Sequence, residues 1–314
     1  MAALEIDVVT GGAGFIGSHL VRALLAEGRR VRVVDDFSSG RRENVPGGVE
    51  LLEGDAEALA ERAARGAAVI YHLAALVSVP RSVDEPLESH RSTAAAAVAI
   101  LQAAERAGAR RVVLASSSAV YGDDPDLPKR EDQAARPASP YAVAKLCAEL
   151  YARHWAAYRG LETVSLRFFN VYGPRQDPSS PYAAAIPIFL SRLRTGRPVP
   201  IHGDGRQTRD FTYVGDVVSG LLAAGRAPGV SGKVYNLASG RATSVLDLVG
   251  LLARLTGTRP ELRFLPPRPG DLRESWADIG RARQDLGYAP RTSLEEGLGA
   301  TLEWFDRDVA ARPS

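Results

Sequence analysis

Short runs of apolar, mostly β-branched residues alternate with longer stretches of helical period through the first half of the chain. Strands are predicted where a short apolar run is bounded by turn residues, at residues 6–10, 30–35, 49–53, 68–73, 111–116 and 162–167. Helices are predicted between them, for example over residues 15–27, 86–107 and 140–158. Because parallel strands need crossover connections, this repeat predicts an α/β fold with a doubly wound parallel sheet covered on both faces.

The pattern changes near Tyr172, where Pro- and Gly-rich stretches such as "YGPRQDPSSPY" and "LPPRPGD" separate shorter elements. Loops of this composition often carry ligand contacts. No linker separates two independent units. We therefore expect a large doubly wound domain over residues 1–170, with some later segments returning to it, and a smaller packed lobe formed mainly by residues 171–314.

The composition argues against several classes of protein. Hydrophobic residues make up 45% of the chain and charged residues 24%, and the formal net charge of +2 gives no sign of a nucleic-acid partner. The single cysteine, Cys147, cannot form an internal disulfide, and the five histidines match no common metal spacing. The longest apolar run, residues 94–101, is too short to span a bilayer, and the N-terminus has no leader pattern. We expect a cytoplasmic protein with no metal and no membrane association.

A glycine-rich stretch, "VVTGGAGFIGSHL", follows the first predicted strand and opens the first helix, with glycines at three-residue spacing from Gly11 to Gly17. Glycine permits a tight turn and lets a pyrophosphate approach the free amides of a helix N-terminus. Asp35 ends the second strand, where a carboxylate can accept both hydroxyls of an adenosine ribose. The combination predicts a Rossmann-type dinucleotide site. Asp35 would repel a 2′-phosphate and favours NAD over NADP, although Arg41 and Arg42 nearby could attract one.

The stretch "SPYAVAK" places Tyr141 and Lys145 four residues apart on a predicted helix, so their side chains share one face. A tyrosine with a pKa near 10 is a poor base at neutral pH, and an adjacent cation favours its phenolate form. A serine cluster, "ASSSAV", ends the fifth predicted strand, at the edge where ligands bind in open α/β folds. These residues predict a tyrosine general base with a serine that bonds the reacting oxygen.

With these signals in place, the sequence resembles the extended short-chain dehydrogenase/reductase family and, within it, the UDP-hexose 4-epimerases. The resemblance covers nearly the whole chain and rests on the motifs "TGGAGFIGSHL", "VVDDFSSG", "HLAA", "SSSAVYGD", "SPYAVAK", "LRFFNVYGPRQDPSSPYAAAIP", "GDGRQTRDFTYV" and "RPGD". It implies an NAD-binding Rossmann domain, a smaller C-terminal lobe that binds a UDP-sugar, and C4 epimerisation through a transient 4-keto sugar. It also implies a homodimer formed through the helices at 86–107 and 140–158.

The resemblance assigns residues by motif, and it makes Ser117, Tyr141 and Lys145 the catalytic residues. The residues that it implies for NAD are Gly11, Gly14, Phe15, Ile16, Gly17, Asp35, Asp36, Ser39, Gly40, Asp55, Ala56, Leu73, Ala74, Ala75, Tyr141, Lys145 and Phe168. The residues that it implies for the UDP-sugar are Ser117, Ser118, Tyr141, Asn170, Ala185, Ile186, Arg209, Arg268, Asp271 and Ser275. Two of these, Arg209 and Arg268, are the implied clamp on the diphosphate, a task that suits the planar guanidinium.

Several positions depart from the family pattern or discriminate among its members. Thr93 stands where the family usually has an asparagine that orders the helix and a water, and His202 replaces an aromatic residue before "GDG". Ser118 and Ala119 occupy the positions of the acid pair of sugar-nucleotide dehydratases, so dehydration is disfavoured. Ser275 is small at a position where a large aromatic residue would exclude N-acetyl groups.

The resemblance therefore implies interconversion of UDP-glucose and UDP-galactose, with tolerance of UDP-N-acetylhexosamines. Asn170 favours a neutral hexose, whereas Arg175 could meet a carboxylate, so a UDP-glucuronate 4-epimerase or decarboxylase is the alternative. An alternative of another class is a non-catalytic protein that senses NAD(P). Such proteins typically lose the Tyr-Lys pair or the serine, and both are present here.

Overall fold

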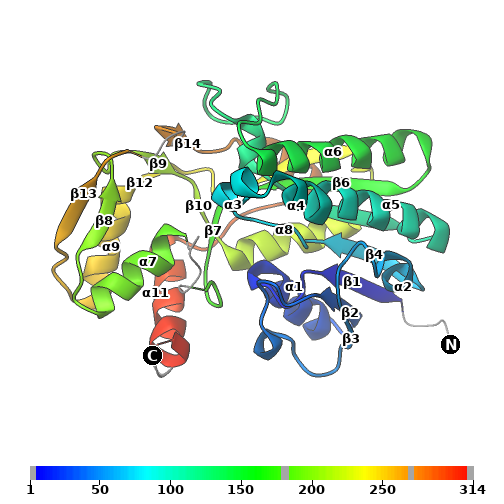
Figure 1. Cartoon of the computed structure of the whole chain (residues 1–314), viewed down its shortest axis with the longest axis horizontal. Coiled ribbons are helices and arrows are strands. Elements are labelled where there is room, and N and C mark those ends of the chain that lie inside the picture. The colour runs from blue at the N-terminus through cyan, green and yellow to red at the C-terminus, as the bar shows by residue number, and fades with distance from the viewer. Residues whose placement is uncertain (1–4, 178–183, 268–271, 310–314) are drawn as a thin grey trace.

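The computed structural model describes residues 5–177, 184–267 and 272–309. A parallel sheet carries helices on both faces, and a smaller lobe lies beside it (Figure 1). In the described residues this sheet has seven strands in the order β11-β6-β5-β4-β1-β2-β3. The strands are β1 (Ile6–Thr10), β2 (Arg30–Asp35), β3 (Glu50–Glu53), β4 (Ala67–His72), β5 (Arg111–Ser117), β6 (Glu162–Phe168) and β11 (Lys233–Leu237).

Helices and short helical turns connect these strands or pack beside them. The helices are α1 (Phe15–Ala26), α2 (Ala60–Ala64), α3 (Val79–Asp84), α4 (Pro86–His90), α5 (Ala96–Ala107), α6 (Pro140–Tyr158), α8 (Val214–Arg226) and α10 (Gly280–Leu286). The turns are η1 (Arg42–Asn44), η2 (Arg91–Ala95) and η3 (Ser118–Tyr121).

The predicted doubly wound α/β fold is confirmed, and β1 to β6 match the six predicted strands to within one residue at either end. The seventh strand, β11, comes from the later part of the chain and pairs in parallel with β6. The prediction of one uninterrupted helix over 86–107 is wrong in one respect, because the π-helical turn η2 divides it. The Ser92 hydroxyl donates to the Glu88 carbonyl at 2.8 Å, and such side-chain bonds compete with the helical ladder.

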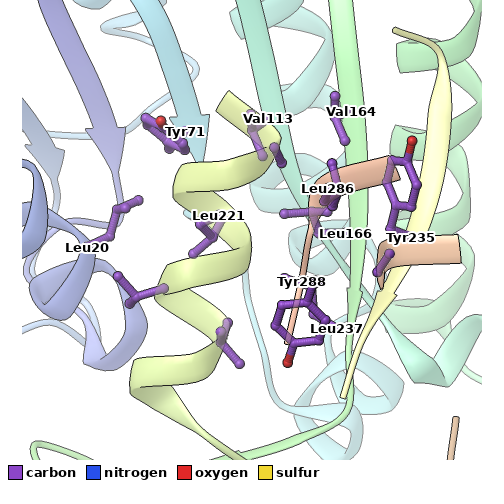
Figure 2. Packing of buried hydrophobic residues seen from close by; sticks show 14 of the residues in the cluster. Leu20, Tyr71, Val113, Val164, Leu166, Leu221, Tyr235, Leu237, Leu286 and Tyr288 are labelled. Atoms are coloured by element: carbon purple, nitrogen blue, oxygen red, sulfur yellow. The ribbon is translucent and has the colours of Figure 1, made fainter. Parts of the chain in front are cut away.

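The two faces of the sheet bury different kinds of side chain. On one face, Figure 2 shows Leu221 of α8 lying between Leu20 of α1 and Leu166 of β6. On the other face, α2, α5 and α6 bury many alanines, among them Ala104 and Ala148. Small side chains let α5 and α6 approach the sheet closely, so α6 is held directly against the ends of β5 and β6.

The smaller lobe has a core of its own, with Leu190, Leu248 and Leu298 fully buried. Its helices are α7 (Ala185–Arg194), α9 (Val245–Thr256) and α11 (Leu294–Trp304), followed by the turn η4 (Phe305–Val309). Its strands form small sheets and comprise β7 (Asn170–Tyr172), β8 (Val199–His202), β9 (Thr208–Arg209), β10 (Phe211–Tyr213), β12 (Thr243–Ser244), β13 (Leu262–Leu265) and β14 (Glu274–Ser275).

The carboxyl ends of the parallel strands share one edge of the large sheet. Thr10, Asp35, Ser117 and Phe168 each end a strand there, and the last two are direct partners in the pairing of β5 with β6. In open α/β sheets ligands bind at this edge. The fold therefore brings the predicted cofactor and catalytic residues to one side of the molecule.

Two other observations concern the described part of the chain. None of its helices combines the length and the apolar character needed to cross a bilayer. No group of three or more His, Cys, Asp or Glu side chains within it is arranged to hold a metal ion.

Candidate active site

The glycine loop forms a tight cradle at the start of α1. Gly11 adopts a φ of +71°, and the Gly14 amide donates to the Gly11 carbonyl at 3.2 Å. A Cβ on Gly17 would stand 2.0 Å from that same carbonyl oxygen, so only glycine lets the helix approach the loop. No side chain caps the helix at Gly14, and its first amides are available to an anion.

Asp35 closes the other side of this cradle. Its buried carboxylate accepts the Ala13 amide at 2.8 Å and the Phe37 amide at 2.9 Å. Burial raises the pKa of Asp35, and these two hydrogen bonds oppose that rise. A Cβ on Gly40 would lie 2.8 Å from the same carboxylate. The carboxylate is thus fixed beside the glycine loop, in position to accept hydrogen bonds from a ribose.

The loop after Asp35 carries the charged side chains that surround the Asp35 carboxylate. Arg41 pairs with Asp177 at 2.6 Å, and Arg42 pairs with Glu53 and lies 4.3 Å from the centroid of the Phe37 ring. Both guanidiniums therefore already have acidic partners. Asp36 and Ser39 are exposed on this loop, and the Asp36 carboxylate accepts hydrogen bonds from Ser38.

The remaining predicted cofactor residues line the same edge. The Leu73 amide donates to the Thr10 carbonyl at 3.1 Å and the Ala74 amide to the Thr10 hydroxyl at 3.3 Å, so the segment after β4 lies against the glycine loop. Other predicted positions differ in exposure. Ala56 is buried, Asp55 is exposed, and Phe15, Ile16, Ala75 and Phe168 are partly buried.

The structure brings Ser117, Tyr141 and Lys145 together where α6 packs on the end of β5. Ser139 caps α6, and the Tyr141 amide donates to the buried Ser82 hydroxyl at 3.2 Å, which fixes the first turn. The Lys145 ammonium donates to the Ala115 carbonyl at 2.7 Å and lies 5.8 Å from the centroid of the Tyr141 ring. The cation therefore sits beneath the tyrosine, as the four-residue spacing requires.

Burial changes the acid-base properties of this pair. It raises the pKa of the Tyr141 phenol, and the hydrogen bond with the Ser117 side chain opposes that rise. Burial lowers the pKa of Lys145 to about 8, and the Glu149 carboxylate opposes that fall. Burial thus makes the Lys145 ammonium a stronger acid than that of an exposed lysine, while Glu149 favours its protonated form.

The predicted substrate residues lie on the small strands that adjoin this edge. Asn170 begins β7 and pairs with Phe211 of β10, and Arg209 of β9 pairs with Ser275 of β14. Ala185 and Ile186 begin α7, and His202 is partly buried with its ring bonded to the Pro266 carbonyl at 3.1 Å. Arg268 and Asp271 lie outside the described residues.

Comparison with known proteins identifies the family. The model of the NAD dependent epimerase/dehydratase family matches residues 8–238. A UDP-glucose 4-epimerase of Mycolicibacterium smegmatis is 42% identical over 95% of this chain and 97% of its own. The chain belongs to the NAD-dependent epimerase/dehydratase family, as its motifs predicted.

Solved structures of family members have the same fold. The UDP-glucose 4-epimerase of Thermotoga maritima, solved with UDP-glucose, is 38% identical with a TM-score of 0.92, over 96% of this chain and 99% of its own. The UDP-N-acetylglucosamine 4-epimerase of Methanobrevibacter ruminantium is 36% identical with a TM-score of 0.93, over 98% of this chain and 100% of its own. The chain is therefore an enzyme of a family of NAD-dependent isomerases.

NAD is the cofactor of this family, and the residues present fit it. The cradle between Gly11 and Gly17 has no room for a side chain, and the amides that begin α1 are uncapped. Asp35 holds a carboxylate beside them, while Arg41 and Arg42 are paired with acidic side chains. This arrangement suits a ribose with free hydroxyls better than one that carries a 2′-phosphate.

The sequence motifs missed a residue that organises the substrate side. Asp210 is fully buried next to Arg209, and its carboxylate accepts the Ser239 amide at 2.7 Å, the Ser239 hydroxyl at 2.6 Å and the Gly240 amide at 2.9 Å. It also accepts the Ala277 amide at 3.3 Å, two residues after Ser275. Asp210 thus joins the two strands that present Arg209 and Ser275. The sequence did contain a signal for Asp210, because this carboxylate directly follows the predicted phosphate-binding arginine.

Buried polar groups near the predicted catalytic residues were missed as well. The Thr10 hydroxyl and His72 Nδ1 are hydrogen-bonded at 2.8 Å, and burial lowers the pKa of His72 to about 3. His72 Nε2 and the hydroxyl of Thr93, in the turn η2, are buried without a hydrogen-bond partner in the described part of the chain. Glu149, one helical turn beyond Lys145, is also buried. Its spacing from Lys145 was the signal that could have drawn attention to it.

Proposed function

We propose that this enzyme interconverts UDP-glucose and UDP-galactose by epimerisation at C4, with tolerance of UDP-N-acetylhexosamines. The observation that carries the proposal is the convergence of Ser117, Tyr141 and Lys145 at the carboxyl edge, followed by Ser118 and Ala119. These last two positions supply neither the acid nor the base that an elimination of water needs. The site is therefore equipped for proton and hydride transfer at one carbon atom.

Each step of this reaction has a residue suited to it. Tyr141 takes the proton from the sugar 4-hydroxyl, while Ser117 donates a hydrogen bond to the same oxygen and Lys145 stabilises the phenolate. When bound, NAD would supply the acceptor for the hydride of C4 and the donor that returns it. The 4-keto sugar turns its other face to the cofactor before the hydride returns, and Tyr141 gives back the proton. No net oxidation results.

Rotation of the keto sugar requires unequal binding, strong on the nucleotide and weak on the hexose. Arg209 is suited to the strong part, because its strand β9 is hydrogen-bonded between β12 and β14 and its neighbour Asp210 is buried. The Arg209 guanidinium donates to the Thr208 carbonyl at 2.6 Å, and its planar fork is of the kind that binds diphosphate oxygens bidentately. We assign Asn170, Ala185 and Ile186 to the nucleotide as well, together with Arg268 and Asp271, which lie outside the described residues.

The choice of sugar is inferred from two residues. Ser275, the partner of Arg209 between β14 and β9, has a small side chain, where a large aromatic residue would exclude an N-acetyl group. Arg175 is the candidate partner of a uronate. Burial lowers its pKa, and the charges that act on it are those of Arg22, Asp308, Arg307 and Tyr213. Since Asp308 already places a carboxylate near this guanidinium, we infer a neutral hexose rather than a uronate.

We also propose a cytoplasmic homodimer. Val83, Leu87, Val143, Leu150 and Tyr151 are exposed on α3, α4 and α6, three helices that pack against one another. A second copy of the same face would remove this apolar surface from water. Sedimentation should show a dimer that Leu150→Glu weakens, and a wild-type monomer would contradict the proposal. The cytoplasm is suggested by Cys147, a free thiol.

The function is tested by incubating the NAD-loaded enzyme separately with UDP-galactose, UDP-N-acetylgalactosamine and UDP-galacturonic acid and resolving the products. We expect the gluco epimer from the first and a slower conversion of the second. Conversion of the third alone would favour the uronate 4-epimerase, and release of a pentose nucleotide would favour the decarboxylase. If NAD is bound and none of the three is converted, the NAD(P)-sensing alternative replaces the enzyme proposed here.

A further inference from the structure

We propose that Glu149, together with Arg167 and Ser116, is a positioning unit that sets the alignment of Tyr141 and the charge of Lys145. The proposal deepens the catalytic assignment above and rests on it. Tyr141, Lys145 and Glu149 follow one another at four-residue intervals on α6 and so form one stripe. We infer the positioning role of Glu149 from the contacts that the side chains of this stripe make with β5.

Each member of the stripe contacts one of the last three residues of β5. The Tyr141 phenol is hydrogen-bonded to the Ser117 side chain, and the Lys145 ammonium donates to the Ala115 carbonyl at 2.7 Å. The Ser116 hydroxyl donates to the Glu149 carboxylate. Three successive turns of α6 thus contact the last three residues of β5, and Glu149 holds the third of these turns through Ser116. A slip of α6 along β5 would break all three contacts together.

Arg167 holds Glu149 from the neighbouring strand. Arg167 is the direct partner of Ser116 in the pairing of β5 with β6, so both donors face the same carboxylate. The guanidinium binds it with two hydrogen bonds, Nε to Oε1 at 2.9 Å and Nη2 to Oε2 at 2.8 Å. It also lies 4.7 Å from the centroid of the Tyr121 ring, whose hydroxyl donates to Asn236 at 2.6 Å.

This ion pair is unusual because both side chains are almost fully buried, with 4% of Arg167 and 1% of Glu149 exposed. Removing two charges from water is costly, and buried pairs often contribute little net stability over apolar residues. The presence of an ion pair at such a position is better explained by the structural element that the pair orients. Here it orients a helix whose preceding two turns carry the catalytic base and its cation.

The charges that face Lys145 give the pair a second role. His72 of β4 has a pKa lowered to about 3 by burial and is neutral, while Tyr141 of α6 has a raised pKa and is protonated in the free site. Arg167 of β6 is positive, and Tyr121 of η3 has a pKa raised to about 12 by burial. Glu149 is the carboxylate that raises the pKa of Lys145 against burial. Its negative charge therefore keeps the ammonium protonated over a wider pH range.

The test replaces Glu149 with glutamine, which preserves the shape and removes the charge. Lys145 should then lose its proton at lower pH, by about one unit, as expected for loss of a nearby opposite charge. The alkaline limb of kcat should move down by the same amount, so that kcat at pH 8 falls about five-fold beyond any uniform loss. KM should change little, because Glu149 does not reach the nucleotide side.

Glu162→Gln is the matched control. Glu162 pairs with the buried Arg111 at 2.6 Å, and these two residues are partners at the opposite end of the same two strands. The control therefore removes a carboxylate from a buried arginine on β5 and β6, but far along the strands from Lys145. It should lower stability and leave the pH profile of kcat and the titration of Lys145 unchanged.

The titration of Lys145 can be followed without any turnover. The chain has three lysines, Lys129, Lys145 and Lys233, so ¹³C labelling at Cε gives three NMR signals that Lys→Arg variants at 129 and 233 assign. If the wild type converts no UDP-sugar, the function proposed above fails while this titration still tests Glu149. An unchanged Lys145 midpoint in Glu149→Gln, or an equal shift in the control, would overturn the proposal.

Glu149→Gln leaves Arg167 buried without its carboxylate and can fail to fold on that account. The double variant Glu149→Gln with Arg167→Gln removes the buried guanidinium together with its carboxylate and serves in its place. Lys145 remains buried there without the attraction of a carboxylate, so its midpoint should still lie below the wild-type value. A wild-type midpoint in the double variant would refute the charge-setting role.

Discussion

Replacing Gly17 with alanine tests whether the glycine cradle is as tightly packed as the structure indicates. The new Cβ would lie 2.0 Å from the Gly11 oxygen, 2.8 Å from the Gly11 carbonyl carbon and 2.9 Å from the Gly12 Cα. Cβ atoms essentially never approach another atom within 3.0 Å, so α1 and the loop must separate by about 1 Å. All three contacts are with backbone, and no side-chain rotation can relieve them.

The expected cost follows from what this separation breaks. Overpacking in a rigid site costs about 1–3 kcal/mol, and the hydrogen bond from Gly14 to the displaced Gly11 carbonyl contributes about 1 kcal/mol more. The higher helix propensity of alanine stabilises the folded state by about 0.5–1 kcal/mol and offsets part of this loss. We therefore expect the free energy of unfolding to fall by about 1–3.5 kcal/mol. The amides that begin α1 move with the helix, so NAD affinity should fall by at least about ten-fold.

The assay is urea unfolding of the NAD-free protein, together with titration of NAD and measurement of the NAD retained on purification. Gly250→Ala is the control, because Gly250 also lies within a helix, α9, and a Cβ there meets nothing within 4 Å. That variant should gain about 0.5–1 kcal/mol and bind NAD normally. If Gly17→Ala matches wild type to within 0.5 kcal/mol and retains NAD, the packing argument is refuted.

Three further predictions concern single side chains. Tyr141→Phe should lower kcat by about a hundred- to ten-thousand-fold with NAD still bound. Tyr158→Phe, exposed on the same helix, should leave kcat unchanged. If the two variants have the same kcat, Tyr141 is not the base. His72 has a folded pKa of about 3 against an ordinary value of 6.5, so its contribution to stability is complete above pH 6.5 and is lost as the pH falls. Unfolding free energy should drop by about 2 kcal/mol between pH 7 and pH 5, and His72→Gln should show a shallower decline. In Asp210→Asn, an NH2 group faces the hydrogen-bond donors that the carboxylate binds in the wild type. KM for the UDP-sugar should therefore rise more than kcat falls. A change confined to kcat would contradict a role of Asp210 in positioning Arg209.

Much of the geometry at the predicted cofactor site could be anticipated because its signals are local. A glycine turn that joins a strand to a helix is written in consecutive residues, and Gly11 and Gly17 meet as that turn requires. The spacing of Tyr141 and Lys145 is likewise a property of one helix. The division of the 86–107 helix by η2 was not predictable in this way, since apolar periodicity does not distinguish a π-helical turn from an α-helical one.

The sequence by itself determined the sheet with its crossover helices, the glycine loop with Asp35, and the pairing of Tyr141 with Lys145. The glycine turn and the Tyr-Lys pair are local in the chain, whereas the sheet and the place of Asp35 follow from the regular alternation of strands and helices. The tertiary structure alone decided that β11 joins β6, that Ser116 and Arg167 grip Glu149, and that Asp210 links the strands of Arg209 and Ser275. These contacts unite distant segments, and their energies depend on burial, which arises only when the layers of the fold close around them.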